Sequence, residues 1–140
     1  MQMSQQIFEN KGLIIFDGYC NLCSSLVHFI IRKDKKDFFR FVALQSESIK
    51  HITLPFNLPS NYSESIILII DDKIFFKSDA VLKIAAKLGG TCSILPGLRI
   101  IPKPIRDFLY DLIAKYRYKL FGKKNKCVIP TDNLKHKFIN

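Results

Sequence analysis

Residues 12–34 read GLIIFDGYCNLCSSLVHFIIRKD, and this stretch combines the features that decide the fold. It opens with a short apolar run, GLIIF, ended by an Asp-Gly pair, as expected for a buried strand that enters a turn. From Cys20 onward a wide apolar stripe repeats at helical spacing and ends in charged residues. The stretch therefore predicts a strand and a helix, with the two cysteines of a CxxC motif at their junction.

The next segment, KKDFFRFVAL (residues 35–44), alternates in polarity and predicts a second strand, with Phe39, Phe41 and Ala43 on one side. A strand, a helix and a strand of these lengths predict a βαβ unit with parallel strands. Residues 45–64 predict a short helix followed by a connection rich in proline and asparagine.

Two β-rich runs, SIILII and KIFF, are separated by Asp71 and Asp72, which predicts an antiparallel hairpin. The following KSDAVLKIAAKLGG predicts a helix, with Ser78 as its N-cap and the glycine pair at 89 and 90 as its end. The predicted fold class is therefore α/β, with a central mixed sheet built from a βαβ unit and a ββα unit and flanked by helices.

Beyond the glycine pair, prolines break the chain, and Pro104 suits the first turn of a further helix. Apolar residues from Ile105 to Leu120 then recur at three- and four-residue spacings, so we expect an amphipathic helix whose apolar face covers the core. We predict a single domain over residues 1–140, divided into a core at 12–90, a helical extension packed on the core at 93–122 and a basic tail at 123–140.

The composition is that of a globular protein, with 48% apolar and 24% charged residues in a chain of 140. The net charge is +10, and the segment from Arg99 to Asn140 contributes +8 of it, with 11 basic and 3 acidic residues. Such an end suits an anionic membrane surface or an acidic partner, or is simply a solvated helix face. Aromatic residues are not interleaved with arginine as in a nucleic-acid stacking platform, so we expect no nucleic-acid partner.

The chain contains no run of about 20 apolar residues, which a membrane-spanning helix would need. The first residues, MQMSQQIFENKG, have neither the basic nor the apolar region of a secretion signal. We therefore expect a cytoplasmic protein whose thiols are kept reduced.

The CxxC pair has several possible roles. A closed zinc site usually takes four thiolate or imidazole ligands, and this chain has one such pair, so we expect no metal. A permanent disulfide is disfavoured in a reducing compartment, and two small buried hydrophobic residues are the least specific alternative. We favour a redox role, because the pair lies at a strand-to-helix junction of a parallel-sheet unit.

In this interpretation Cys20 lies at or just before the helix N-terminus, where free backbone N–H groups and the helix dipole stabilise a thiolate. We expect Cys20 to be the attacking thiol. Cys23, one turn later and expected to lie further inside, would be the resolving thiol that attacks the mixed disulfide.

Residues 16–47, FDGYCNLCSSLVHFIIRKDKKDFFRFVALQSE, resemble the opening of the DCC-type thiol-disulfide oxidoreductases, a thioredoxin-like family with an Asp-Cys-Cys motif. The resemblance extends through SIILIIDDKIFFKSDAVLKIAAKLGG and IPKPIRDFLYDLIAKYRYKLFGKKNKC and covers about residues 12–131. It implies a thioredoxin-like fold and protein-disulfide oxidoreductase activity on a protein or small thiol substrate. It also implies the functional triple Asp17, Cys20 and Cys23, with the redox-active cysteine pair in place of a cofactor.

The residues around the cysteines have expected supporting roles. Asp17 can orient the loop through bonds to backbone N–H groups or accept a proton from the second cysteine. Gly18 is expected to give the loop a backbone angle that side chains disfavour. Asn21 and Leu22 would tune the redox potential by packing, and Cys127, inside the family-like stretch, is a possible auxiliary thiol.

One departure from ordinary thioredoxins concerns the proline that precedes the strand facing the CxxC motif. Thioredoxins have a cis-proline there, whereas this chain has Ser65 or a neighbour, and the nearest upstream proline is Pro59. We therefore expect a different contact with substrate.

Overall fold

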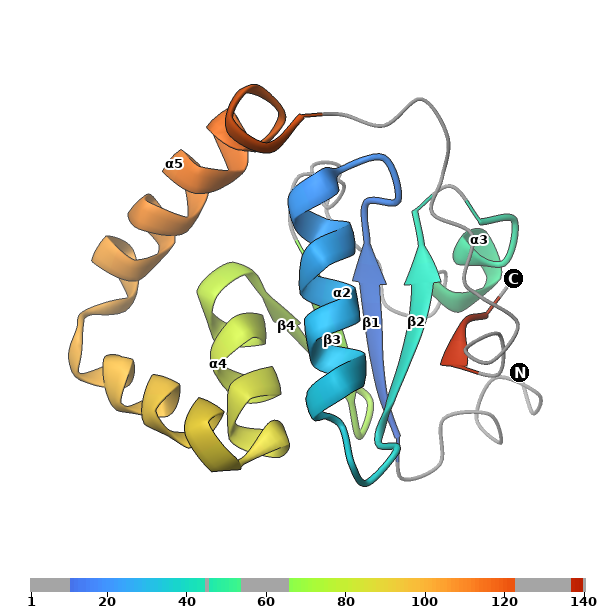
Figure 1. Cartoon of the computed structure of the whole chain (residues 1–140), viewed down its shortest axis with the longest axis horizontal. Helices are drawn as coiled ribbons and strands as arrows, with labels where there is room; N and C mark the ends of the chain where they lie inside the picture. Colours follow the sequence, from blue (N-terminus) through green and yellow to red (C-terminus); the bar gives the residue numbers. More distant parts are fainter. Residues whose placement is uncertain (1–10, 45, 54–65, 123–136, 140) are drawn as a thin grey trace.

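The computed structural model describes residues 11–44, 46–53, 66–122 and 137–139. The strands are β1 (Gly12–Phe16), β2 (Phe39–Ala43), β3 (Ile67–Ile70) and β4 (Lys73–Phe76). The helices are α2 (Asn21–Lys33), α3 (Ile49–Thr53), α4 (Lys77–Leu88) and α5 (Lys103–Phe121), with a 3₁₀ helix, η3 (Gly90–Ile100), before α5 (Figure 1). The sheet order is β2-β1-β3-β4, with β1 and β2 parallel and the other pairs antiparallel. This mixed sheet flanked by helices confirms the predicted α/β, thioredoxin-like fold.

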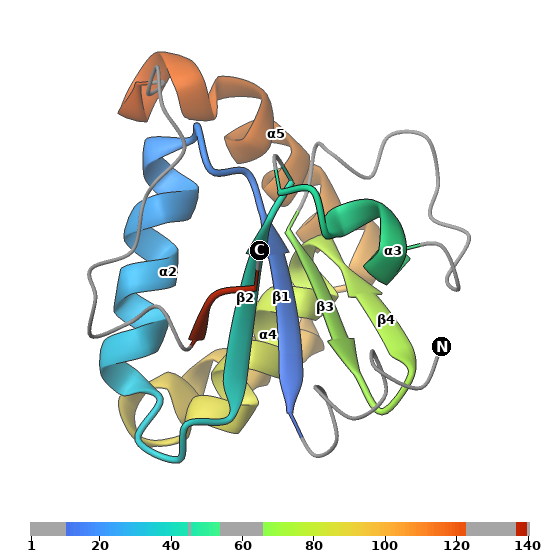
Figure 2. The ribbon, with the colours of Figure 1, turned by 90° about the vertical axis from the view of Figure 1, so that its right-hand side faces the viewer.

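Both faces of the two central strands, β1 and β3, are buried, which explains why these strands are apolar at successive positions, whereas the edge strand β4 is only partly buried. On one face α2 and α4 cover side chains such as Ile14, Phe41 and Leu68. On the other face α3 contributes Ile49 and Ile52 to a second cluster (Figure 2). The βαβ unit is confirmed, and the predicted Phe39 and Phe41 side of β2 is the one that faces α2 and α4.

The hairpin between β3 and β4 is confirmed. Asp71 and Asp72 both have positive φ, 50° and 61°, as a two-residue type I′ turn requires. Aspartate tolerates this conformation better than most residues, because its short side chain bonds locally.

The start of α4 differs from the prediction. Ser78 is not the N-cap, because the helix already begins at Lys77, with Phe76 in the cap position and no side-chain cap bond. The Ser78 hydroxyl instead donates to the carboxylate of Asp107 on α5. The end of α4 is as predicted, with Gly89 in the cap position at a φ of 66°.

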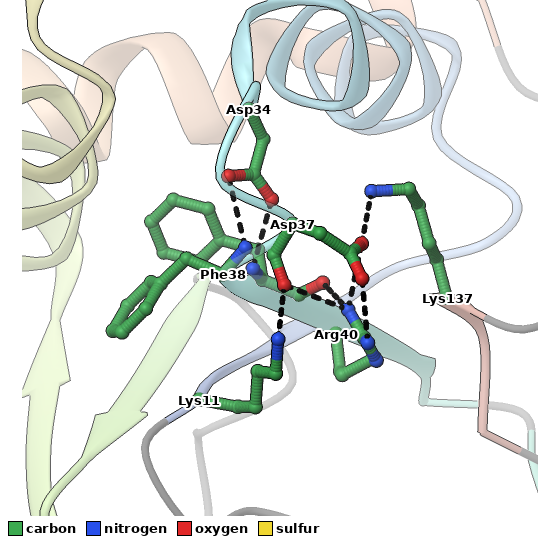
Figure 3. A network of polar contacts seen from close by, with 7 residues as sticks. Lys11, Asp34, Asp37, Phe38, Arg40 and Lys137 are labelled. Carbon is green, nitrogen blue, oxygen red and sulfur yellow. Dashed lines mark hydrogen bonds and ion pairs between the residues drawn. The ribbon is translucent and has the colours of Figure 1, made fainter.

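A charge network closes the end of the sheet where β1 begins (Figure 3). The carboxylate of Asp37 accepts two bonds from Arg40, both at 3.0 Å, and one from Lys137 at 2.6 Å. Lys11 donates to the Asp37 carbonyl oxygen, and Asp34 accepts the backbone N–H groups that open β2. Arg40 and then Lys137 hold the pKa of Asp37 well below its usual range. The network therefore joins three parts of the chain that are far apart in sequence.

Residues near the C-terminus lie along the outer edge of β2 (Figure 2). Phe138 forms a parallel bridge with Phe41, and the Ile139 N–H donates to the Phe41 carbonyl at 2.8 Å. The Phe138 ring packs 5.6 Å from that of Phe41 and 6.2 Å from that of Phe16. These contacts extend the sheet by a short segment.

The helix α5 corrects a prediction. We expected its apolar face to cover the core, but these side chains are exposed, from 39% at Tyr116 to 70% at Leu120. Tyr110 is an exception, since it packs against the core cluster and accepts the Ile66 N–H at 2.9 Å. Otherwise α5 contacts α4 through charged side chains, such as the pair of Lys77 and Asp111.

Candidate redox site

The site begins where β1 ends, at Asp17. This residue is only 7% exposed, and its Oδ1 atom accepts the Tyr19 N–H at 3.0 Å. Its carbonyl oxygen accepts the Cys20 N–H at 3.3 Å. Asp17 therefore folds the chain into the short turn that leads from the strand into α2, which is the Asx-type geometry expected for it.

Cys20 is the N-cap residue of α2, with extended backbone angles (φ −84°, ψ 121°). Its Sγ atom accepts the Cys23 N–H at 3.4 Å, the position that an Asp or Ser oxygen usually takes in a cap. Its carbonyl oxygen accepts both the N–H and the hydroxyl of Ser24, at 3.0 and 2.9 Å. The first turn of α2 contains no acidic residue. A sulfur in this position lies where a helix best stabilises negative charge.

Cys23 lies one helical turn after Cys20, and both are free thiols. The expected order of depth is wrong, because Cys20 is fully buried whereas Cys23 is partly exposed. Cys20 ends the loop that follows a buried strand, while Cys23 packs at the margin of the core cluster. The position of a residue along the helix therefore does not predict its depth here.

The end of α5 contacts the first turn of α2, a neighbour that sequence reasoning missed. The Asn21 N–H donates to the carbonyl of Gly122 at 3.5 Å. Gly122 has a φ of 83°, and a Cβ atom there would come within 2.9 Å of the Asn21 side chain. The sequence indicates that a glycine such as Gly122 can end a helix, but it does not indicate that this glycine contacts Asn21, about 100 residues away.

The other supporting residues lie beside the cysteines. Asn21 and Leu22 are partly exposed in the first turn of α2. Gly18 is buried in the loop between Asp17 and Tyr19, and the backbone angle that we expected of it stays a prediction.

Cys127, Ser65 and Pro59 lie outside the described residues, so the auxiliary thiol and the altered substrate contact stay predictions. Within residues 11–44, 46–53, 66–122 and 137–139, no three His, Cys, Asp or Glu side chains gather as a metal site would require. In the same part of the chain, no helix has the length and apolar character needed to cross a membrane.

A mixed sheet flanked by helices, with Cys20 as the cap of the first long helix and Cys23 in its first turn, defines a thioredoxin-like protein with two thiols at the expected place. The comparisons with known proteins agree with this class. The chain belongs to the DCC1-like thiol-disulfide oxidoreductase family, whose family model matches residues 14–123. Membership supports a thiol-disulfide oxidoreductase function in general terms.

Two relatives extend over most of the chain. The uncharacterized protein YuxK of Bacillus subtilis is 39% identical over 137 residues, which is 98% of this chain and 99% of that protein. A chloroplastic DCC family protein of Arabidopsis thaliana is 36% identical over 120 residues, covering 85% of this chain and 70% of that protein. No solved structure matches the chain.

Proposed function

We propose that the protein exchanges thiols and disulfides by cycling Cys20 and Cys23 between a dithiol and a disulfide. The observation that carries this proposal is the cap geometry, in which the Cys20 sulfur accepts the Cys23 N–H at the N-terminus of α2. This arrangement directs a backbone N–H and the N-terminal end of the helix dipole at one sulfur, and it keeps the second cysteine one turn away.

In the reducing direction, the Cys20 thiolate attacks a substrate disulfide and forms a mixed disulfide, while the other substrate sulfur leaves as a thiolate. Cys23 then loses its proton and attacks the Cys20 sulfur, which closes the Cys20–Cys23 disulfide and releases the second substrate thiol. The substrate gains two electrons and the protein loses two. An external thiol or dithiol must then reduce the protein again.

The depth of the two cysteines bears on the order of attack. The Cys20 sulfur accepts the cap hydrogen bond of α2, but it is fully buried, so it must become accessible before it meets a substrate. Cys23 is partly exposed and has no such cap position. We assign the attack to Cys20, because the thiolate and not the thiol is the nucleophile.

The role that we propose for Asp17 is to hold the loop and to accept the proton of Cys23. Its bond to the Tyr19 N–H supports the first part. Asp17→Asn keeps an oxygen for that bond but removes the negative charge, whereas Asp17→Ala removes both. If exchange slows in both variants, Asp17 moves a proton; if only the Ala variant is slow, its role is to orient the loop.

The test of the cysteines uses a Cys92→Ser, Cys127→Ser background, which leaves Cys20 and Cys23 as the two thiols of the chain. We expect this protein to reduce the disulfides of insulin with dithiothreitol as the electron source. Its redox potential should fall within about −120 to −270 mV, the range of known thioredoxin-like proteins. Loss of activity in the background itself would show instead that Cys127 or Cys92 takes part.

In that background, Cys20→Ser should abolish exchange, and Cys23→Ser should accumulate mixed disulfides with substrate. Non-reducing electrophoresis and mass spectrometry detect these adducts. If Cys20→Ser accumulates the adducts instead, the order of the two cysteines is the reverse. If neither variant forms adducts and both retain activity, the proposal is wrong.

The substrate that we propose is a thiol or disulfide of a protein or small molecule. Protein-disulfide reduction is the finer form of this proposal, and the insulin assay measures it directly against glutathione disulfide as the small substrate. The cytoplasmic location expected from the sequence stays a prediction.

A further inference from the structure

The outward side of α5 carries a continuous row of exposed apolar side chains, which we call the α5 apolar face. It consists of Ile105, Phe108, Leu109, Leu112, Ile113, Tyr116 and Leu120. The preceding η3 also exposes apolar side chains, with Ile94 79% and Ile100 91% exposed. Contiguous exposed apolar side chains on this scale mark an interaction surface rather than the usual scatter of single residues.

The opposite side of α5 holds the helix on α4 through polar contacts. Asp107 accepts the Ser78 hydroxyl, and Asp111 pairs with Lys77 at 2.9 Å. Asp79 on α4 accepts bonds from Lys103 and Arg106 on α5. These pairs, together with the core contact of Tyr110, accompany an orientation in which the charged side of α5 lies against α4 and the apolar face points outward.

The charge on the outward side has one sign. The two acidic residues of α5, Asp107 and Asp111, both lie against α4, and the sequence of η3 contains none. Lys115 and Lys119 are exposed and follow Leu112 by three and seven residues, so they project beside the apolar face. Arg99 is exposed on η3. Whatever covers this surface must therefore be apolar and anionic.

We propose that the α5 apolar face docks on the surface of an anionic lipid bilayer. A helix with an apolar face and lysines beside it lies in the plane of the headgroups, with its apolar side chains at the acyl boundary. Basic residues near an anionic leaflet strengthen this binding, and Tyr116 has the amphipathic ring typical of that interface. This docking is independent of the thiol chemistry proposed above.

Two other occupants fit this surface less well. A second copy of the chain would bring Lys115 and Lys119 of both copies together, on a protein that already carries a net charge of +10. An acidic protein would have to supply carboxylates and an apolar groove along a helix of 19 residues, which is about 28 Å long. An anionic bilayer supplies both negative charge and an apolar phase along the whole helix.

The test is co-sedimentation of the full chain with vesicles. One set consists of phosphatidylcholine alone, and the other of equal parts of phosphatidylcholine and phosphatidylglycerol. We expect binding to the second set, with little binding to the first, and an affinity that falls as salt rises from low to physiological ionic strength.

Two variants separate the apolar and the electrostatic contributions to vesicle binding. Phe108→Ser with Leu112→Ser should weaken binding at least about tenfold, because it removes apolar area from the docking side. Lys115→Glu with Lys119→Glu should weaken binding by about tenfold or more. The matched control is Lys50→Glu with Lys73→Glu, which lowers the net charge from +10 to +6 as the Lys115 and Lys119 pair does, at exposed positions on α3 and the hairpin. We expect it to weaken binding by less than about threefold.

Several results would overturn the proposal. The first is a lack of binding to the anionic vesicles at low salt by a protein whose circular dichroism shows it to be folded. The second is an equal loss of vesicle binding in the control variant, which would mean that the electrostatic attraction to the vesicles is not specific to α5. The third is a stable dimer in sedimentation experiments without lipid that Phe108→Ser with Leu112→Ser dissociates. The fourth is binding to soluble polyglutamate but not to vesicles, which would favour an acidic protein.

Discussion

The helices α4 and α5 are both amphipathic, but they use their apolar faces in opposite ways. In α4 the apolar side chains are turned onto the sheet, and Leu82, Ile84 and Ala85 are buried. In α5 the apolar side chains face outward, and the charged side is turned toward α4. An amphipathic pattern therefore predicts that a helix forms, but not which of its faces the rest of the protein covers.

The difference arises from the surface that each helix meets. The sheet offers α4 a purely apolar face, so burial of apolar area decides how the helix packs. The outer side of α4 offers α5 a row of polar groups, including Lys77, Ser78 and Asp79, and α5 has matching charges on one side. Pairing these groups leaves the apolar side of α5 outward.

The largest expected effect is on the free energy of unfolding, and a pair of matched Phe→Ala substitutions tests it. Phe41 is fully buried, whereas Phe108 is 67% exposed. We expect Phe41→Ala to lower the free energy of unfolding by about 3–5 kcal/mol, because it leaves a cavity in the core. Phe108→Ala should change it by less than about 0.5 kcal/mol. Urea unfolding followed by circular dichroism measures both. A loss above about 2 kcal/mol in Phe108→Ala would mean that the α5 apolar face is covered in the isolated protein.

An intermediate effect is expected where α5 does reach the core. The Tyr110 hydroxyl accepts the N–H of Ile66, a residue that is 4% exposed. Tyr110→Phe removes this acceptor from a buried amide and should cost about 1–2 kcal/mol of unfolding free energy. The control is Tyr116→Phe on the exposed face, for which we expect no measurable change. Equal losses in the two variants would contradict the distinction between the two sides of α5.

The smallest effect concerns the ion pairs between α4 and α5. A hydrogen bond from Lys103 holds the pKa of Asp79 below its usual value, and Arg106 acts in the same direction. Because the folded-state pKa is depressed, this contribution to stability is present above about pH 3.9, the unfolded value, and is lost as the pH falls through the folded value. The side chain is partly exposed, so we expect less than about 1 kcal/mol.

Urea unfolding of the wild type and of Asp79→Asn, at about pH 7 and about pH 3, measures this contribution. The difference in unfolding free energy between the wild type and Asp79→Asn should be smaller at the lower pH. Asp79 also raises the pKa of Lys103, whose contribution is present below its unfolded value of about 10.4 and is lost above it. The contribution of the Asp79 and Lys103 pair to stability should therefore be flat across neutral pH. A difference that persists unchanged in acid would show that the charge of Asp79 is not its cause.

The sequence predicted those features that depend on neighbouring residues. The βαβ unit, the hairpin at Asp71 and Asp72, the end of α4 at Gly89 and the placement of Cys20 at a helix start all follow from local patterns. Each depends on backbone preference or on apolar spacing within about a dozen residues.

The incorrect predictions depend on contacts between distant segments. Ser78 is not a cap, because α4 already begins at Lys77, and the Ser78 hydroxyl donates to Asp107 on another helix. The depth of Cys20 and the contact of Asn21 with Gly122 likewise involve packing that no local pattern encodes. The pairing of Asp37 with Lys137 spans 100 residues and was not predicted at all.

The short bridge of Phe138 on β2 has a consequence for aggregation of the protein. β2 is an outer strand, and an outer strand with free backbone groups is a template on which another molecule can add. Phe138 and Ile139 cover part of this strand edge, and Lys137, next to them in the sequence, forms an ion pair with Asp37. We therefore expect substitutions that displace Phe138 and Ile139 to expose this strand edge and to favour aggregation.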